Sequence, residues 1–266
     1  MIPRFTSVRF PPYLGFMKFL LRAFRHKIRL KHSPYIFSRT ACLGNDSLKL
    51  SGASKSKYVF NLQKGRSDLL LRSYSSDEIK PLFSAHKFIG SRDIRDMVWQ
   101  QSNTYFHDFP KPVFILFDSF SDLTDLCFTA PSQAAFYCHK SDLKTPSGNR
   151  GITAHGLLDL DSVEKLYKSL FNNFRLAWGD VEIIFIHFPT KLETRQFYIE
   201  RANRIKSAIE NLAQTIPNLH SIEIPISLVN PEKSLTRGVD RFPYHYSLET
   251  KEFVANKISE ILLVKR

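Results

Sequence analysis

The sequence has few cysteines, and their spacing excludes two common kinds of scaffold. Cys42, Cys127 and Cys138 are the three cysteines in 266 residues, and none has the spacing of a CxxC or Cys/His zinc site. We therefore predict no disulfide scaffold, no structural metal and no bound cofactor. The few cysteines also indicate a protein of a reducing compartment. With 43% hydrophobic residues, the chain can instead bury a substantial core.

Acidic residues are absent from the first 45 positions, although the whole chain carries a formal net charge of +13. Nine of its cations lie in this arm: Arg4, Arg9, Lys18, Arg22, Arg25, Lys27, Arg29, Lys31 and Arg39. A nucleic-acid-binding protein typically spreads such charge over its folded domain, and no RNP, helix-turn-helix or zinc pattern accompanies it here. Nucleic acid is therefore not favoured as a partner, whereas another anionic surface is.

A candidate interfacial helix lies within this arm at residues 16–30. Its apolar residues recur at helical spacing: Phe16, Met17, Leu20, Leu21, Phe24 and Ile28. The interleaved cations favour a helix lying on an anionic membrane surface, and the segment is too short and too charged to span a bilayer. A basic helix packed on the domain and an Arg-rich targeting segment are open alternatives. We expect a cytoplasmic protein, peripheral at the inner membrane face.

The region after the arm reads as a small β-rich segment, residues 46–80. Three β-like runs, at 48–50, 58–62 and 68–72, predict either an antiparallel meander or the first strands of the main sheet. A helix is expected at 91–106, and a continuous apolar run predicts a buried strand at 111–117. A polar loop at 118–125 and a long loop or lid at 127–155 should follow.

Regular α/β alternation then extends to the end of the chain. A capping box at Asp161–Glu164 opens a helix that ends at Trp178, and Ser247 caps the last helix. Between them come a strand at 181–187, a helix at about 193–213 and a strand at 219–224, with Arg201, Lys206 and Glu210 expected in water. This order predicts an α/β domain over residues 81–266, with a mostly parallel sheet and helices on both faces.

The last ninety or so residues resemble the carboxyl half of the SGNH/GDSL hydrolase superfamily. The shared features are an apolar strand ending near Pro189, a helix rich in Arg and Asn, a short strand, and a loop with Asp and His before the final helix. The layout also resembles uncharacterised members from capsule and polysaccharide gene clusters, without their Gly-Ser-Cys turn. The resemblance implies a flavodoxin-like α/β fold and ester hydrolysis or acyl transfer by serine and histidine.

The resemblance assigns His245 as the base and Asp240 as its orienting carboxylate. Asp240 lies five residues before His245, and Phe242 stands at the expected Asp position. Ser119, in the run Phe117-Asp118-Ser119, resembles the Gly-Asp-Ser nucleophile with Phe in place of Gly. If residues 111–118 instead match the later Gly-x-Asn-Asp strand, Ser91 is the alternative nucleophile.

Three further residues, Asp118, His187 and Tyr244, are predicted to bind substrate. Each candidate also has a plain structural interpretation: Ser119 as a helix N-cap, and His187 and His245 as packed or hydrogen-bonded histidines. The favoured function is an esterase or O-acyltransferase acting on a glycan. The alternative is a noncatalytic SGNH-like domain that binds a saccharide or protein partner.

The charge of the arm generates a direct test. Replacing Lys18, Arg22 and Arg25 together with Gln should abolish flotation of the protein with anionic vesicles, because each cation near such a surface contributes about 1 kcal/mol to binding. Neutral vesicles are the control. Binding that survives the triple substitution would exclude the electrostatic membrane role.

Overall fold

A five-stranded parallel sheet forms the centre of the molecule, in the order β2-β1-β3-β7-β8. The structure is a computed structural model that describes residues 25, 28–63, 66–71, 109–129, 135–139, 153–232 and 245–264. The strands are β1 (Tyr35–Arg39), β2 (Tyr58–Asn61), β3 (Ile115–Asp118), β7 (Ile183–Ile186) and β8 (Leu219–Ile222). The mostly parallel α/β sheet is therefore confirmed, in the strand order of flavodoxin-like folds.

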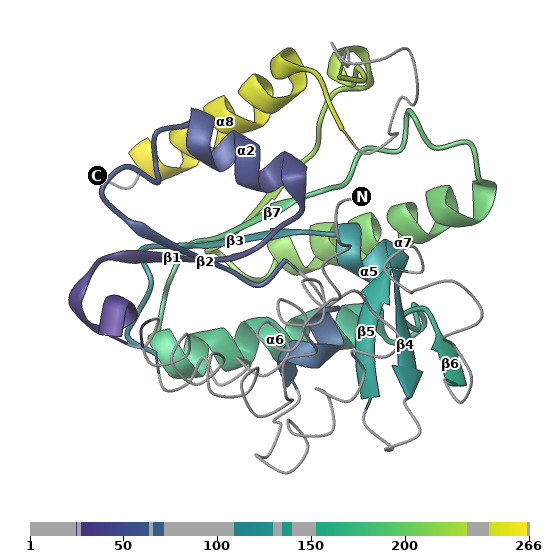
Figure 1. The fold of residues 1–266 in the computed structure, drawn as a ribbon, viewed down its shortest axis with the longest axis horizontal. Helices are drawn as coiled ribbons and strands as arrows, with labels where there is room; N and C mark the ends of the chain where they lie inside the picture. The colour runs from purple at the N-terminus through teal and green to yellow at the C-terminus, as the bar shows by residue number, and fades with distance from the viewer. Residues whose placement is uncertain are drawn as a thin grey trace, which may run out of the picture.

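Helices cover both faces of this sheet, as predicted. Helices α2 (Cys42–Leu50) and α8 (Leu248–Leu263) lie together on one face, and α6 (Val163–Trp178) and α7 (Gln196–Ala213) lie on the other (Figure 1). Ser247 caps α8 by accepting a hydrogen bond from the Thr250 backbone N–H. The predicted capping box of α6 is wrong, because Ser162 is the N-cap and makes no side-chain cap bond.

Aromatic side chains fill the space between the sheet and α6. Phe37 of β1 and Phe174 of α6 both contact the Trp178 ring, with centroids 5.3 and 5.4 Å away. Phe117 of β3 lies 5.7 Å from Phe174. The apolar run predicted as a buried strand is fully enclosed, since Ile115, Leu116 and Phe117 expose no surface. Burial on both faces accounts for its continuous hydrophobicity.

The stretch after β3 departs from the prediction of a polar loop and a lid. A short helix, α5 (Phe120–Thr124), leads into an antiparallel sheet in the order β5-β4-β6. Its strands are β4 (Asp125–Thr129), β5 (Ala135–His139) and β6 (Thr153–Gly156). These strands are too short for a clear alternating pattern, so their pairing with one another, and not local sequence, defines them.

The segment before β3 resolves one open alternative and corrects two predictions. β2 pairs with β1, so the run at 58–62 belongs to the main sheet and not to a separate meander. The run at 48–50 lies in α2, and the run at 68–72 corresponds to a 3₁₀ helix, η1 (Ser67–Leu71). Both runs pack leucines inward from a helix, which a short apolar stretch cannot distinguish from a strand.

Little of the basic arm falls within the described residues. Strand β1 lies in the range assigned to the arm, Leu30 is 2% exposed in the core, and Ile28 is 43% exposed. None of the described helices is long and apolar enough to cross a membrane. The helix expected at 91–106 lies outside the described residues, and the domain boundaries at 45 and 80 stay a prediction.

A buried ion pair joins strand β1 to helix α5. The Arg39 guanidinium (2% exposed) binds both Asp122 oxygens (0% exposed), with Nη2 2.9 Å from Oδ1 and Nη1 3.1 Å from Oδ2. Ser67 donates to the same carboxylate from its backbone N–H and its hydroxyl, and the Tyr167 hydroxyl donates at 2.6 Å. The network thus connects β1, η1, α5 and α6, and the Asp122 carboxylate is fully hydrogen-bonded.

Arg201 of α7 extends this network and corrects the prediction that it lies in water. Its Nη2 donates to the backbone carbonyls of Asp122 at 3.1 Å and Leu158 at 2.9 Å, and the residue is 7% exposed. Two carbonyl acceptors that no sequence pattern reveals offset part of the cost of burying this cation, while its Nε is buried without a hydrogen-bond partner among the described residues.

We predict that Asp122→Ala lowers the free energy of unfolding by about 3 to 5 kcal/mol, because it leaves the buried Arg39 guanidinium without its carboxylate. Chemical denaturation measures the change. Asp161→Ala is the matched control, since it breaks a 2.7 Å pair with Arg204 that is largely exposed. That control should cost about 1 kcal/mol or less, and equal losses in the two variants would contradict the structural role of the buried pair.

Candidate functional site

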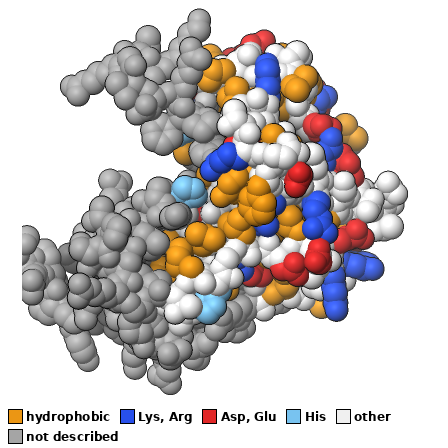
Figure 2. Space-filling view, turned by 90° about the vertical axis from the view of Figure 1, so that its right-hand side faces the viewer, with side chains coloured by type: hydrophobic (Ala, Val, Ile, Leu, Met, Phe, Trp, Pro, Cys, Tyr) orange, Lys and Arg blue, Asp and Glu red, His pale blue; other side chains and the backbone are white. Residues whose placement is uncertain are grey.

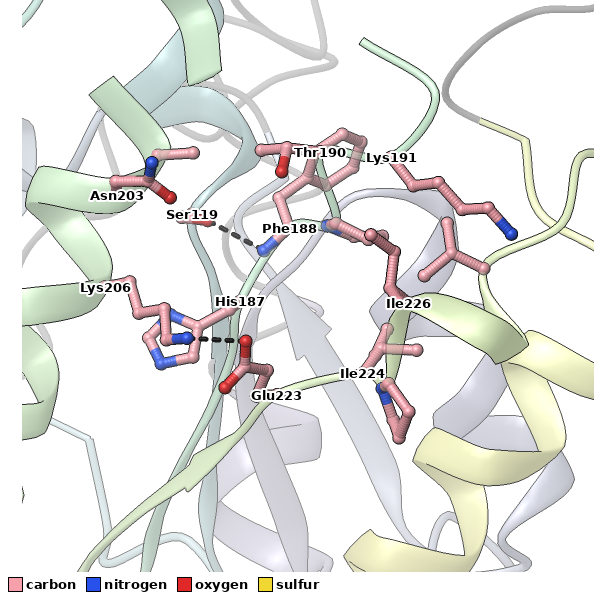
Figure 3. A pocket seen from close by; sticks show the side chains of 14 residues that line it. Ser119, His187, Phe188, Thr190, Lys191, Asn203, Lys206, Glu223, Ile224 and Ile226 are labelled. Atoms are coloured by element: carbon pink, nitrogen blue, oxygen red, sulfur yellow. Dashed lines mark hydrogen bonds and ion pairs between the residues drawn. The ribbon is translucent and has the colours of Figure 1, made fainter. Parts of the chain in front are cut away.

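A pocket of about 310 Å³ opens at the carboxyl ends of β3, β7 and β8. Parallel α/β sheets keep their ligand sites at this edge. Its polar lining comprises Ser119, His187, Thr190, Asn203, Lys206 and Glu223, with Lys191 at its margin (Figure 3). Figure 2 faces this side of the molecule and shows apolar side chains in the middle, with acidic and basic side chains toward one flank.

Ser119 lies in the wall of this pocket, directly after β3, and is 2% exposed. Its Oγ accepts a hydrogen bond from the Phe188 backbone N–H at 3.0 Å, which joins the ends of β3 and β7. Ser119 is also the N-cap residue of α5, yet its side chain makes no cap bond. The hydroxyl therefore faces β7 and the pocket. The neighbouring Asp118, and not Ser119, accepts a hydrogen bond from the first N–H of α5, that of Phe120.

Asp118 links the end of β3 to the residues that follow β1 by hydrogen bonds. Its Oδ2 accepts from the Ala41 N–H at 2.6 Å, and its Oδ1 accepts from the Phe120 N–H at 3.1 Å. Burial raises the pKa of this carboxyl to about 6, although both hydrogen bonds and Arg39 favour the charged form. Asp118 is 2% exposed and is not among the residues that line the pocket, so its predicted role in substrate binding stays a prediction.

His187 lines the same pocket as Ser119, and its predicted role in substrate binding stays a prediction. Its Nε2 lies 2.7 Å from the Ser221 hydroxyl of β8, and its backbone N–H donates to Ile222. Burial, together with the nearby Lys206 ammonium, lowers the pKa of His187 to about 4, while Glu223 opposes the shift. The imidazole is therefore neutral at pH 7.

An ion pair between α7 and the end of β8 closes one side of the pocket. Lys206 Nζ contacts the Glu223 carboxylate (Figure 3) and lies 3.7 Å from Glu210. The hydrogen bond to Glu223 is the main cause of the raised pKa of Lys206. Neither this pair nor Ser221 was predictable from the sequence, because their contacts join separate elements. The i, i+4 spacing of Lys206 and Glu210 was the one local signal.

His245 lies beside Glu232 and not in the pocket. Its side chain is 50% exposed, and its Nδ1 is 3.9 Å from Glu232 Oε2, while the other oxygen of Glu232, Oε1, contacts Lys251 of α8. Among the described residues, no hydrogen bond joins His245 to Ser119. The structure thus brings Ser119 and His187 together and places His245 elsewhere on the loop before α8.

Three sequence candidates, Ser91, Asp240 and Tyr244, lie outside the described residues, and their roles stay predictions. Within the described part of the chain, no group of three His, Cys, Asp or Glu side chains could hold a metal ion.

Asp118 should make stability depend on pH. A carboxyl whose pKa rises from 3.8 to about 6 on folding stabilises the protein below pH 3.8, and this contribution is lost as the pH rises through 6. Relative to Asp118→Asn, the free energy of unfolding of the parent should therefore fall by about 2 to 3 kcal/mol between pH 4 and pH 7. Denaturation of both proteins across this range measures the difference; a constant difference would contradict the raised pKa.

Comparison with known proteins identifies no family model that matches this chain and no curated protein that matches it. Among solved structures, a candidate acylhydrolase from Bacteroides fragilis aligns at 10% identity and a TM-score of 0.45, covering 91% of this chain and 95% of its own. The salicylyl-acyltransferase SsfX3 from a tetracycline biosynthetic pathway aligns at 11% identity and a TM-score of 0.39. That alignment covers 88% of this chain and 55% of SsfX3. At these values, neither neighbour's activity transfers to this chain.

Proposed function

We propose that this protein is an SGNH-like esterase or O-acyltransferase that acts on an acyl ester of a glycan, with Ser119 as the nucleophile. The observation that carries the proposal is the position of Ser119: it follows a buried strand, at the sheet edge where this fold keeps its sites, and lines a pocket. A rigid strand end holds a nucleophile at one position, which favours attack on a bound ester.

The reaction is a two-step acyl transfer. Ser119 Oγ attacks the carbonyl carbon of the ester while a base takes the hydroxyl proton, and the sugar hydroxyl leaves with that proton. Water or a second hydroxyl then takes the acyl group from Ser119. The Phe188 N–H points at Oγ, where it stabilises negative charge that develops on this oxygen, and Lys206 supplies positive charge to the same pocket.

The lining of the pocket suits both halves of such a substrate. Thr190, Asn203 and Lys191 offer hydrogen-bonding groups for sugar hydroxyls, whereas Ile224, Ile226 and Val229 offer an apolar surface for a short acyl chain. A volume of about 310 Å³ lies at the small end of ligand pockets. A single acylated sugar unit is therefore the expected ligand, carried on a longer glycan outside the pocket.

A peripheral position on an anionic membrane surface belongs to the same proposal. Its support is the acid-free basic arm, which would hold the pocket near glycans assembled at the inner face of a membrane.

A noncatalytic saccharide-binding domain is the second candidate, and three observations favour it. Ser119 Oγ already accepts the Phe188 N–H, and His245 lies half exposed beside Glu232. In addition, Phe117 stands where the superfamily signature has Gly. A domain of this kind would keep the pocket and lose the reaction.

Labelling with a fluorophosphonate probe distinguishes the two candidates. We expect covalent labelling of the parent protein and loss of at least about 100-fold in labelling rate in Ser119→Ala, because the nucleophile is removed. Ser207→Ala, which alters an exposed serine of α7 outside this pocket, is the matched control.

Absence of labelling in the parent would contradict the enzymatic proposal. If an unlabelled parent still binds acylated oligosaccharides in calorimetry, and Asn203→Ala weakens that binding, the noncatalytic alternative stands instead.

A further inference from the structure

We propose that His187, held by Ser221, is the general base that activates Ser119. The inference rests on the proposed acyl-transfer function and names the base for it. It replaces the assignment of His245, which the superfamily resemblance suggested. A candidate base must lie within reach of the hydroxyl that it deprotonates, and His187 is the histidine of the described chain that shares a pocket wall with Ser119.

Chain connectivity and the pairing of β3 with β7 bring the two residues near each other at the pocket. Ser119 Oγ is hydrogen-bonded to the backbone N–H of Phe188, the residue that directly follows His187. In Figure 3 the His187 ring lies below Ser119, on the side of Lys206 and Glu223. β3 and β7 pair directly up to Asp118 and Ile186, so Ser119 and His187 each follow the last paired residue of their strand. The Ser119–Phe188 hydrogen bond holds the two strand ends together at this point.

Ser221 supplies the third member of the arrangement. Its hydroxyl lies 2.7 Å from His187 Nε2, and the register of β7 with β8 places Ser221 opposite Phe185. When Nε2 carries the proton and donates it to Ser221 Oγ, Nδ1 is left with the free lone pair that a base requires. No described residue forms a hydrogen bond with Nδ1, so this nitrogen is available to a hydroxyl in the pocket.

The charges around His187 favour its neutral form before the reaction. Lys206 of α7, itself bound to Glu210 and Glu223, is the cation that faces the imidazole, and Glu223 at the end of β8 is the anion. Burial and Lys206 keep the ring neutral across the neutral pH range. Once the ring takes a proton, the Glu223 carboxylate stabilises the imidazolium, which limits the cost of the transfer.

The proton transfers balance over the two steps. The Ser119 hydroxyl proton moves to His187 Nδ1 as Oγ bonds to the carbonyl carbon, and the imidazolium returns it to the departing sugar oxygen as the ester C–O bond breaks. In hydrolysis, water then gives a proton to Nδ1 and its oxygen attacks the acyl carbon. That proton returns to Ser119 Oγ as the acid is released.

The test measures the rate of fluorophosphonate labelling against pH for the parent, His187→Gln and Ser221→Ala. His187→Gln should lower the rate at pH 7 by about 100-fold or more, as expected for loss of a general base. The parent rate should rise as the pH passes through about 4 and then level off, because the base form of His187 is the active one. His220→Gln is the matched control, since it alters the neighbouring β8 histidine that bonds Glu182.

Ser221 is a positioning residue, and its variant has a separate signature. Ser221→Ala should lower the labelling rate about tenfold, because the hydrogen bond that orients Nε2 is lost. It should also move the acidic limb, the range of pH over which the rate rises, to higher pH, because water reaches the ring. Lys206→Met should move the limb in the same direction, since the lost ammonium lowers the pKa of His187. A purely structural role for Ser221 would leave the limb in place.

The outcomes separate this inference from the function on which it rests. If the parent is labelled and His187→Gln reacts at the parent rate, while His245→Gln does not react, the inference is overturned and the enzymatic function stands. A parent that is never labelled overturns both. Should His187→Gln fail to fold, as judged by its thermal melt, the limb of the Ser221→Ala variant decides, because this exposed serine can be removed with little cost to the fold.

Discussion

The buried pair of Arg39 and Asp122 is the interaction on which the arrangement of this molecule depends. Removing two charges from water is costly, so such a pair persists only when every donor and acceptor finds a partner. Here Ser67 and Tyr167 complete the Asp122 carboxylate, and Arg201 binds its backbone carbonyl. The network therefore fixes the position of α5, the helix that begins one residue after Ser119.

Asp118 and Asp122, four residues apart, have complementary roles at the carboxyl end of β3. Asp122 binds a guanidinium and orients α5 against the helices below the sheet. Asp118 binds two backbone N–H groups and joins the turn after β1 to the turn after β3. Together they hold the carboxyl edge of the sheet from two sides. The pocket can thus present polar side chains on a framework that does not depend on its ligand.

The sequence predicted the regular half of the fold well, for a physical reason. α6, α7 and α8 are long, and their apolar residues recur every three to four positions, so burial and periodicity carry the same signal. β3 and β7 are short, but their uninterrupted apolar character predicts strands covered on both faces. Predictions were wrong where elements are short and defined by their neighbours, as in α2, η1 and the sheet of β4, β5 and β6.

The site was predictable only in part, because its contacts join residues distant in the chain. The position of Ser119 after a buried strand was visible from local pattern alone. The pairing of His187 with Ser221 was not, since it depends on the register of β7 with β8. Likewise, the burial of Arg201 follows from carbonyl groups of Asp122 and Leu158, and a helical wheel places that side chain in water.

The hydrogen bond between the Phe188 N–H and Ser119 Oγ also bears on how this chain can evolve. It extends the β3–β7 ladder by one bond that a side chain, not the backbone, completes. Replacing the serine with alanine would remove this acceptor from a buried N–H, at a cost of about 1 to 3 kcal/mol. Selection for folding alone is therefore enough to retain a hydroxyl at position 119. A lineage that abandoned catalysis would therefore still carry a serine at position 119.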